Sequence, residues 1–385
     1  GRRKPLVVVV DDIQWAEPLF LDLLEHLAEW VRRAPAVLVG LARPELRDIR
    51  SALAEPSRWL AATIALEGLD AVATAELAAR LVGADSLPSE LVARLPDSTE
   101  GNPLFVRELM RMLVDDGVIE QTTNGWQLTI DADAVEVPPT IQSLLSARLD
   151  RMPVDERRLV ELASVVGPEF ALGAVGSIAD GIDSRDLRRS LERLRRRELI
   201  ESAGTYWGDE PIYRFHHVLI RDAAYRRLLK RTRADLHLRV GEWTERTATD
   251  LPGEHEVAIA HHYEQAHEYR RQLDDIDEAT ASVGRKAAEL LGAAAERSLE
   301  RDDLAAASSL AERSLARLDE GDAMVPPMLV VAAEALLGLG DIGRGRPVVE
   351  RLSAVVGADE RMTPWAESFV AQLTMLTEPD RLREA

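Results

Sequence analysis

The chain has 385 residues, of which 46% are hydrophobic and none is cysteine, and its formal net charge is −20. This length allows about two to four domains, the absence of cysteine excludes disulfides and thiolate metal sites, and the strong negative charge argues against non-specific nucleic-acid binding by the chain as a whole. No apolar run is long enough to span a membrane and no signal peptide is visible, so we expect a cytoplasmic protein without a membrane partner.

The first predicted element is a buried strand that ends in two acids. Residues 6–10 are five apolar residues, four of them β-branched, which predicts a strand buried on both faces. Asp11 and Asp12 follow at its carboxyl end, where open α/β sheets bind ligands. This element resembles the Walker B element of P-loop NTPases, and the resemblance implies that Asp11 holds Mg²⁺ and that Asp12 orients or deprotonates the attacking water. The alternative is that Asp12 serves as a cap for the helix beginning near Glu17.

The next six residues extend this element to Asp-Asp-Ile-Gln-Trp-Ala-Glu-Pro. The string is similar to the DD-(I/L)-(H/Q)-W-A-(D/E)-P signature of bacterial STAND ATPases, a signalling branch related to AAA+ proteins. Such an NTPase needs an upstream glycine-rich loop, G-x-x-x-x-G-K-[ST], whose N–H groups cradle the phosphates. Only ten residues precede Asp11, and none of the three lysines lies in that pattern. The chain also begins with Gly1 rather than Met, so we expect a fragment that lacks the P-loop and is inactive alone.

An amphipathic helix is predicted over residues 18–32 and a second buried strand over residues 36–42, directly before Arg43. The strand–Arg–Pro–Glu pattern resembles the sensor 1 position of STAND ATPases. An arginine at the end of a strand beside Walker B could reach a γ-phosphate bidentately. The alternative is an exposed arginine before a proline turn. With a last short strand expected at 61–69, residues 1–66 are interpreted as the C-terminal half of a P-loop NTPase core.

Residues 67–137 are interpreted as a helical lid. In the string GNPLFVREL, Asn102 as N-cap and Pro103 at the first helical position make a good helix start, and this physical reason alone accounts for the spacing. The string also resembles the lid motif of the same ATPases, in which the proline packs near the adenine. The resemblance therefore implies that Gly101 and Pro103 bind nucleotide. Asn124-Gly125 predicts a hairpin turn after this helix.

Residues 138–230 are interpreted as a winged helix. The pattern predicts helices from about residue 141, at 154–166, at 172–180 and at 185–197, the last capped by Ser184, and wing strands at 199–202 and 212–215. Residues 185–239 hold 15 basic and 8 acidic residues, and the basic run 193–197 lies at the position of a recognition helix. It could contact DNA phosphates. Because the chain is acidic overall, we favour the alternative of a solvated face or a surface that docks acidic neighbours in the same protein.

The segment YRFHHVLIRDAAY closes this region. It resembles the F-x-H-x-L-I-R-D-x-A-Y motif that ends the winged helix of cyclase-linked STAND proteins. It is also similar to the Met-His-Asp motif of disease-resistance NTPases, in which the histidine touches the ADP phosphate and locks the resting state. By position His217 is the match, not His216. A protonatable donor near a diphosphate is chemically sensible; the alternative is a histidine that caps or packs at a helix start.

Residues 231–385 are predicted to be helical. Four histidines, at 255, 261, 262 and 267, lack a zinc-type spacing, and ordinary helix surface is the favoured interpretation. The pattern of residues 294–313 recurs at an offset of 38 in residues 332–351 and resembles tetratricopeptide-like (TPR-like) repeats, which build concave protein-binding surfaces. The alternative is a plain helical bundle.

Together the resemblances imply a multidomain chain, α/β and then mostly α. Its parts would be a partial NTPase core (1–66), a helical lid (67–137), a winged-helix domain (138–230) and a TPR-like region (231–385). The implied partners are proteins bound by the repeats and, as a further possibility, other copies of the chain; nucleic-acid binding is disfavoured and no membrane partner is expected.

The implied function is an ATP-dependent signal-transduction switch. ADP would hold lid and winged helix closed through Pro103 and His217, and exchange for ATP–Mg²⁺ at Asp11, Asp12 and Arg43 would release them. The resemblance of the three motifs to those of cyclase-linked STAND proteins favours an adenylate or guanylate cyclase as the linked effector. Two alternatives stay open, namely an ATP-dependent transcription regulator with a LuxR-type DNA-binding domain and a nucleotide-free TPR scaffold.

Overall fold

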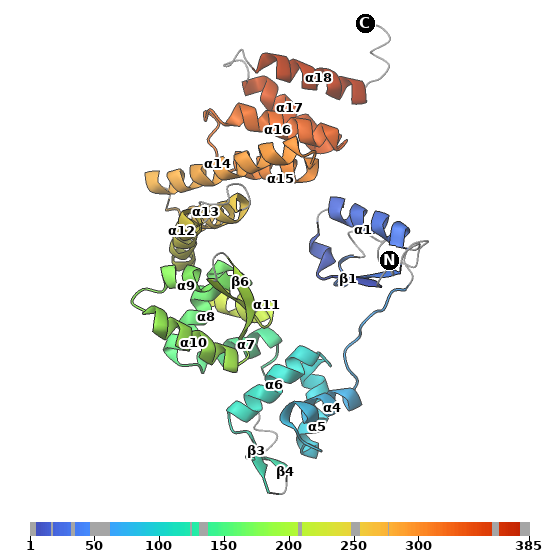
Figure 1. Ribbon diagram of the computed structural model, residues 1–385, viewed down its shortest axis with the longest axis vertical. Coiled ribbons are helices and arrows are strands. Elements are labelled where there is room, and N and C mark those ends of the chain that lie inside the picture. The colour runs from blue at the N-terminus through green and yellow to red at the C-terminus, as the bar shows by residue number, and fades with distance from the viewer. Residues whose placement is uncertain are drawn as a thin grey trace. The chain divides into compact units, whose positions relative to one another are not determined.

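The computed structural model of the chain is shown in Figure 1. It describes residues 5–16, 18–31, 35–46, 62–123, 125–130, 138–206, 210–247, 255–275, 277–355 and 362–377. Over these residues the chain is mostly helical, with sixteen α-helices and three small sheets, as the sequence predicts at that coarse level. It divides into two compact units, one of residues 67–290 and one of residues 1–66 and 291–385. No helix in the described ranges combines the length and apolarity needed to cross a membrane.

The N-terminal segment is a strand–helix–strand unit. It contains β1 (Leu6–Val10), the 3₁₀ helix η1 (Ile13–Trp15), α1 (Pro18–Val31) and β2 (Ala36–Gly40). The two strands pair in parallel, from Leu6 opposite Ala36 to Val10 opposite Gly40, so both predicted strands and the helix between them are confirmed as elements. Their predicted burial is wrong, because most residues of both strands are exposed. The further strand expected at 61–69 is wrong for residues 62–69, which form no strand, while residue 61 lies outside the described residues. In this short apolar run Ile64 and Leu66 are exposed, and no described strand pairs with it.

The next segment packs three helices and a hairpin. These elements are α4 (Ala71–Val82), α5 (Ser89–Thr99), α6 (Pro103–Asp115), β3 (Ile119–Thr122) and β4 (Gly125–Leu128). Their core is formed by leucines and methionines of α5 and α6, including Leu95, Leu109 and Leu113. The predicted hairpin is confirmed as an antiparallel β3–β4 pair, although its turn residue Asn124 lies outside the described residues.

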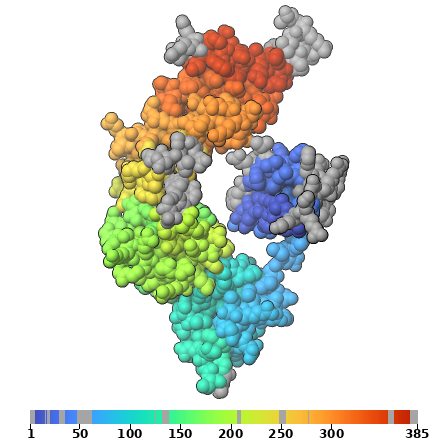
Figure 2. Space-filling view, in the orientation of Figure 1, coloured from blue at the N-terminus to red at the C-terminus, as the bar shows by residue number. Residues whose placement is uncertain are grey.

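Residues 138–230 fold around a small antiparallel sheet. The helices are α7 (Ile141–Asp150), α8 (Val154–Val166), α9 (Leu172–Ile178), α10 (Ser184–Arg196) and α11 (Val218–Arg227), and the strands are β5 (Glu169–Ala171), β6 (Ile200–Tyr206) and β7 (Glu210–Phe215). The sheet order is β5–β7–β6. The predicted cap of α10 is off by one residue, because the carboxylate of Asp183, not Ser184, accepts the Arg185 N–H at 3.1 Å. Figure 2 shows this part of the unit (green) packed directly against residues 67–123 (cyan), in keeping with the contact of α6 with α7.

The rest of the chain is a succession of helices in which most neighbours pack together. They are α12 (Lys230–Thr247), α13 (Glu256–Arg271), α14 (Glu278–Glu300), α15 (Leu304–Leu315), α16 (Val325–Gly338), α17 (Ile342–Val355) and α18 (Thr363–Thr377). The internal repeat falls on equivalent helix starts. Asp303 accepts the Ala306 N–H before α15, and Asp341 accepts the Arg344 N–H before α17, each at 3.1 Å. The second pair lies 38 residues after the first, which is the offset of the sequence repeat, so the repeat marks a structural unit.

Among the described residues, six helices end in the same way. In each, one residue adopts the left-handed conformation, and the next N–H donates to the carbonyl five residues earlier, as in the Schellman motif. Three of these left-handed residues are glycines and three are acids: Gly83, Gly117, Gly340, Glu198, Asp274 and Asp302.

Candidate functional site

The predicted site residues fall into both compact units, and each unit holds three of them. The unit that contains the N-terminal sheet holds Asp11, Asp12 and Arg43, and the unit of residues 67–290 holds Gly101, Pro103 and His217.

Asp11, Asp12 and Arg43 lie at one edge of the parallel sheet. The two acids follow β1 and the arginine follows β2, and all three are exposed. Since parallel strands end at the same edge, this is the edge at which α/β sheets bind ligands. Asp12 has φ 53° and ψ 37°, a left-handed conformation that costs a non-glycine residue about 1–3 kcal/mol and is typical of functional sites. Its side chain makes no capping bond to η1, while Glu17, where the alternative places the start of the capped helix, lies outside the described residues, so that alternative stays open.

Gln14 joins two of these residues, and the sequence analysis assigned it no role. Its Nε2 donates to Asp12 Oδ1 at 2.8 Å, and its Oε1 accepts the Arg43 N–H at 3.1 Å. The only sequence signal for Gln14 is that a polar residue stands between Ile13 and Trp15 in the signature. Its burial is visible only in the fold. The structure thus connects Asp12 to Arg43 through one side chain.

The acids fit a nucleotide-bound Mg²⁺ better than an independent metal centre. Within the described ranges, no group of three or more His, Asp or Glu side chains is placed to hold a metal ion. Mg²⁺ is usually held by one or two carboxylates together with substrate phosphates and water. Asp11, with Asp12 beside it, could supply that carboxylate share.

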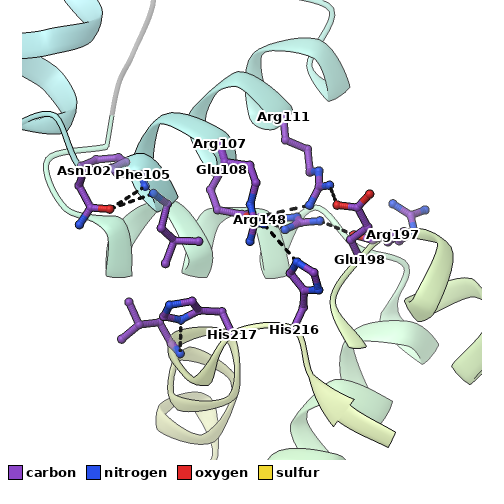
Figure 3. Close-up of polar contacts among 12 residues, drawn as sticks. Asn102, Phe105, Arg107, Glu108, Arg111, Arg148, Arg197, Glu198, His216 and His217 are labelled. Carbon is purple, nitrogen blue, oxygen red and sulfur yellow. Dashed lines mark hydrogen bonds and ion pairs between the residues drawn. The ribbon is translucent and has the colours of Figure 1, made fainter. Parts of the chain in front are cut away.

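Gly101 and Pro103 shape the start of α6. The side chain of Asn102 accepts the N–H groups of Leu104 and Phe105 at 3.0 and 3.2 Å (Figure 3), which confirms the predicted N-cap. Gly101 has φ +66°, and its carbonyl accepts the Leu69 N–H at 2.8 Å. A Cβ at Gly101 would lie 2.2 Å from the Leu69 carbonyl oxygen. Capping and close backbone approach account for these residues without a ligand, so the adenine contact stays a prediction.

His217 caps a helix, as the alternative interpretation expects. Its Nδ1 accepts the Leu219 N–H at 3.1 Å at the start of α11 (Figure 3). The neighbouring His216 points to α6, with Nε2 3.1 Å from Arg107 Nη1. Burial, and then the positive charge of Arg107, lower the pKa of His216, so this histidine is held in its neutral form. A contact of His217 with a diphosphate stays a prediction.

Beside these histidines lies a buried cluster of charged side chains. We name it the Glu108 cluster (Arg107, Glu108, Arg111 and Arg148). The fully buried Glu108 pairs with Arg148, and its Oε1 lies 3.6 Å from Arg107 Nε and 3.7 Å from Arg111 Nη1 (Figure 3). Arg148 also donates to the Arg197 carbonyl at 2.7 Å. The cluster therefore ties α6 to α7 and to the end of α10. Its only sequence signal is that Arg111 follows Glu108 by three residues and Arg107 by four, which places each pair on one side of a helix.

A second buried network involves the tyrosine that ends the third motif. Tyr225 Oη lies 2.8 Å from His237 Nε2 and 2.9 Å from Tyr269 Oη, and His237 Nδ1 lies 2.8 Å from His262 Nδ1. The expectation that His262 belongs to the helix surface is wrong, because this side chain is buried while its neighbour His261 is exposed. Successive residues on a helix face different directions, so His262 is buried against His237 of α12, while the exposed His261 lies edge-on to the same histidine, with ring centroids 6.1 Å apart.

We expect this network to make stability depend on pH. Burial is the largest cause that lowers the pKa of His237 and of His262. The pKa of His262 falls to about 3, against about 6.5 in the unfolded chain. Below pH 6.5 the unfolded state therefore binds more protons, and stability falls as the pH falls, by about 2 kcal/mol per histidine between pH 7 and 5. Urea unfolding across this range will measure it. His262→Gln should make the free energy of unfolding depend much less on pH, while His261→Gln, at the exposed neighbour, should change this pH dependence far less. Equal pH dependence in the two variants would contradict the buried pair.

Comparisons with known proteins add two similarities. Residues 71–123, from α4 through β3, match a domain of unknown function, DUF8739. The chain is also 27% identical over 246 residues to an uncharacterized protein of Rhizobium meliloti (strain 1021). That match covers 62% of this chain and 22% of the relative, so the chain spans about a fifth of the length of the curated relative it matches.

Proposed function

We propose that this chain is part of an ATP-dependent signal-transduction switch of the STAND/AAA type that regulates a linked effector. The observation that carries the proposal is the parallel β1–β2 sheet with Asp11, Asp12 and Arg43 at its carboxyl edge. A strand–helix–strand unit with acids after the first strand and an arginine after the second supplies the catalytic and sensor positions of such an ATPase. In this proposal Asp11 holds the Mg²⁺ of ATP, and ATP or ADP is the ligand.

The exposure of the sheet supports the same proposal. Parallel sheets are normally buried on both faces, and successive strand residues point to opposite faces. In β1, Leu6 is 58% exposed, Val7 63% and Val9 59%, and Val37 of β2 is 55% exposed. Apolar surface on both faces calls for further layers. In the proposed ATPase these are the strands and helices of the half that carries the phosphate loop.

The remaining segments take roles consistent with this switch. Residues 67–137 are the lid, residues 138–230 are a winged helix built on the β5–β7–β6 sheet, and residues 231–385 are TPR-like repeats that bind a protein partner in the cytoplasm. The winged helix is proposed to dock protein rather than DNA. Arginines of α10 and its C-terminus are engaged by acids of the same chain, Arg193 and Arg197 with Glu156 at 2.7 and 3.0 Å. The effector is proposed to be an adenylate or guanylate cyclase.

Calorimetry with ADP and with ATP–Mg²⁺ tests the proposal. It compares this chain with a version extended upstream of Gly1 to include the phosphate loop that the proposal requires. We expect only the extended version to bind. In it, Asp11→Asn should remove the Mg²⁺-dependent part of ATP affinity and leave Mg²⁺-free ADP binding unchanged, while Asp22→Asn on the exposed side of α1 should change neither. If the extended version binds neither nucleotide, the proposal fails and a nucleotide-free scaffold of helical repeats is left.

A further inference from the structure

Gln14 is a buried amide with a partner at each end. The side chain is 6% exposed, although it belongs to the short η1 helix between the exposed acids and α1. Burying an amide without hydrogen bonds is costly, and here Asp12 Oδ1 and the Arg43 N–H satisfy it. A residue that only filled space at this position would be apolar.

The two partners fix the orientation of the amide. The Arg43 N–H can only donate, so it must face Oε1, and Nε2 is then the atom that donates to the Asp12 carboxylate. Glutamate at this position would lose that donor and bring a second negative charge to Asp12. Methionine would match the size and lose both bonds. The position thus requires a donor and an acceptor on one long side chain.

The backbone around Gln14 is held in place by the sheet. The Leu41 N–H donates to the Val10 carbonyl at 2.8 Å, and the Ile13 N–H donates to the Leu41 carbonyl at 3.0 Å. Ile13 is buried against Gly40, where a Cβ would lie 3.0 Å from the Ile13 side chain. Gln14 therefore projects from a segment anchored to the ends of both strands.

We infer that Gln14 is a positioning residue for ATP hydrolysis, holding the Asp12 carboxylate in one orientation relative to the strand end that carries Arg43. This inference rests on the proposed function. A carboxylate that accepts from a fixed amide does not rotate freely, so its alignment with an attacking water is set before ATP arrives. The same amide holds the backbone N–H of Arg43, so the water-orienting acid and the γ-phosphate contact are aligned by one side chain. Removing such an outer partner typically costs 10–100-fold in activity.

Steady-state ATP hydrolysis by the extended protein tests the inference. We expect Gln14→Glu and Gln14→Met to lower kcat about 10–100-fold while KM for ATP and the affinity for ADP change little, because neither substitution removes the Asp11 carboxylate or the Arg43 guanidinium. Gln127→Glu, an exposed glutamine on β4, is the control for the added charge. Thermal unfolding of each variant shows whether the fold is retained.

A double-mutant cycle separates positioning from a merely structural role. If Gln14 acts through Asp12, then Gln14→Met should cause no further loss of kcat in an Asp12→Asn background. Additive losses would overturn the inference, as would Gln14 variants that hydrolyse ATP within twofold of the parent or lose activity only through KM. A parent protein that neither binds nor hydrolyses ATP would instead refute the proposed function, so the two failures are distinguishable.

Discussion

Gly101→Ala is expected to destabilise the unit of residues 67–290 by about 3 kcal/mol or more. The new Cβ would lie 2.2 Å from the Leu69 carbonyl oxygen and 2.6 Å from its nitrogen, and the position has φ +66°. Both neighbours are backbone atoms, so the two segments must separate and the Leu69–Gly101 hydrogen bond is lost. The midpoint of urea unfolding, with probes in this unit, will measure the change.

Gly83→Ala is the matched control for this substitution. Gly83 ends α4 with a nearly identical φ of +68°, but nothing lies within 4 Å of its ideal Cβ. Its substitution should cost only the left-handed strain, about 1–2 kcal/mol. If Gly101→Ala costs no more than Gly83→Ala, the close approach of the two backbones is not what selects glycine. A contact with nucleotide would then be the better explanation for glycine at position 101.

Glu108→Gln is expected to cost about 3–5 kcal/mol. Glu108 is fully buried, and its partner Arg148 is nearly so, with a side-chain exposure of 10%. Neutralising the acid leaves the guanidinium of Arg148 without its counter-charge, beside Arg107 and Arg111. Burial, and then the positive charge of Arg148, lower the pKa of Arg111. The positive charges around Glu108 therefore already repel one another.

An exposed ion pair between the same two helices serves as the control. Arg151 pairs with Asp116, at side-chain exposures of 52% and 21%, and links the ends of α7 and α6. Arg151→Gln should cost about 1 kcal/mol or less. The double variant Glu108→Gln with Arg148→Gln should cost less than the sum of the single ones, because neither charge is then left alone. Equal costs for Glu108→Gln and Arg151→Gln would contradict the buried cluster.

The local fold was largely predictable because its signals are local. Periodicity placed α1, α8 and the β6–β7 pair, and the cap at Asn102 followed from residue type alone. The expected strand at 61–69 failed because β-propensity describes a surface that must pack against a neighbour, and Ile64 and Leu66 are 81% and 91% exposed.

The candidate site was predictable only in part. Asp11, Asp12 and Arg43 could be placed at one sheet edge because strand ends are visible in sequence. His237 and Glu108 have partners 25 and 40 positions away, in His262 and Arg148, and one of the two partners of Gln14, the Arg43 N–H, is 29 positions away. Spacing within a helix or strand carries no information about such pairs. They follow only from tertiary packing, which also decides which of two adjacent histidines is buried.

The six similar helix ends have a consequence for behaviour in solution. Where Gly83, Gly117 and Gly340 adopt the left-handed conformation freely, Glu198, Asp274 and Asp302 adopt it at a cost of about 1–2 kcal/mol each. An acid at the end of a helix also faces its partial negative charge. These three positions add to a net charge of −20, and a large charge of one sign keeps copies of a protein apart. At these helix ends the chain gives up local stability, and at Glu198 the acid forms an ion pair with Arg111.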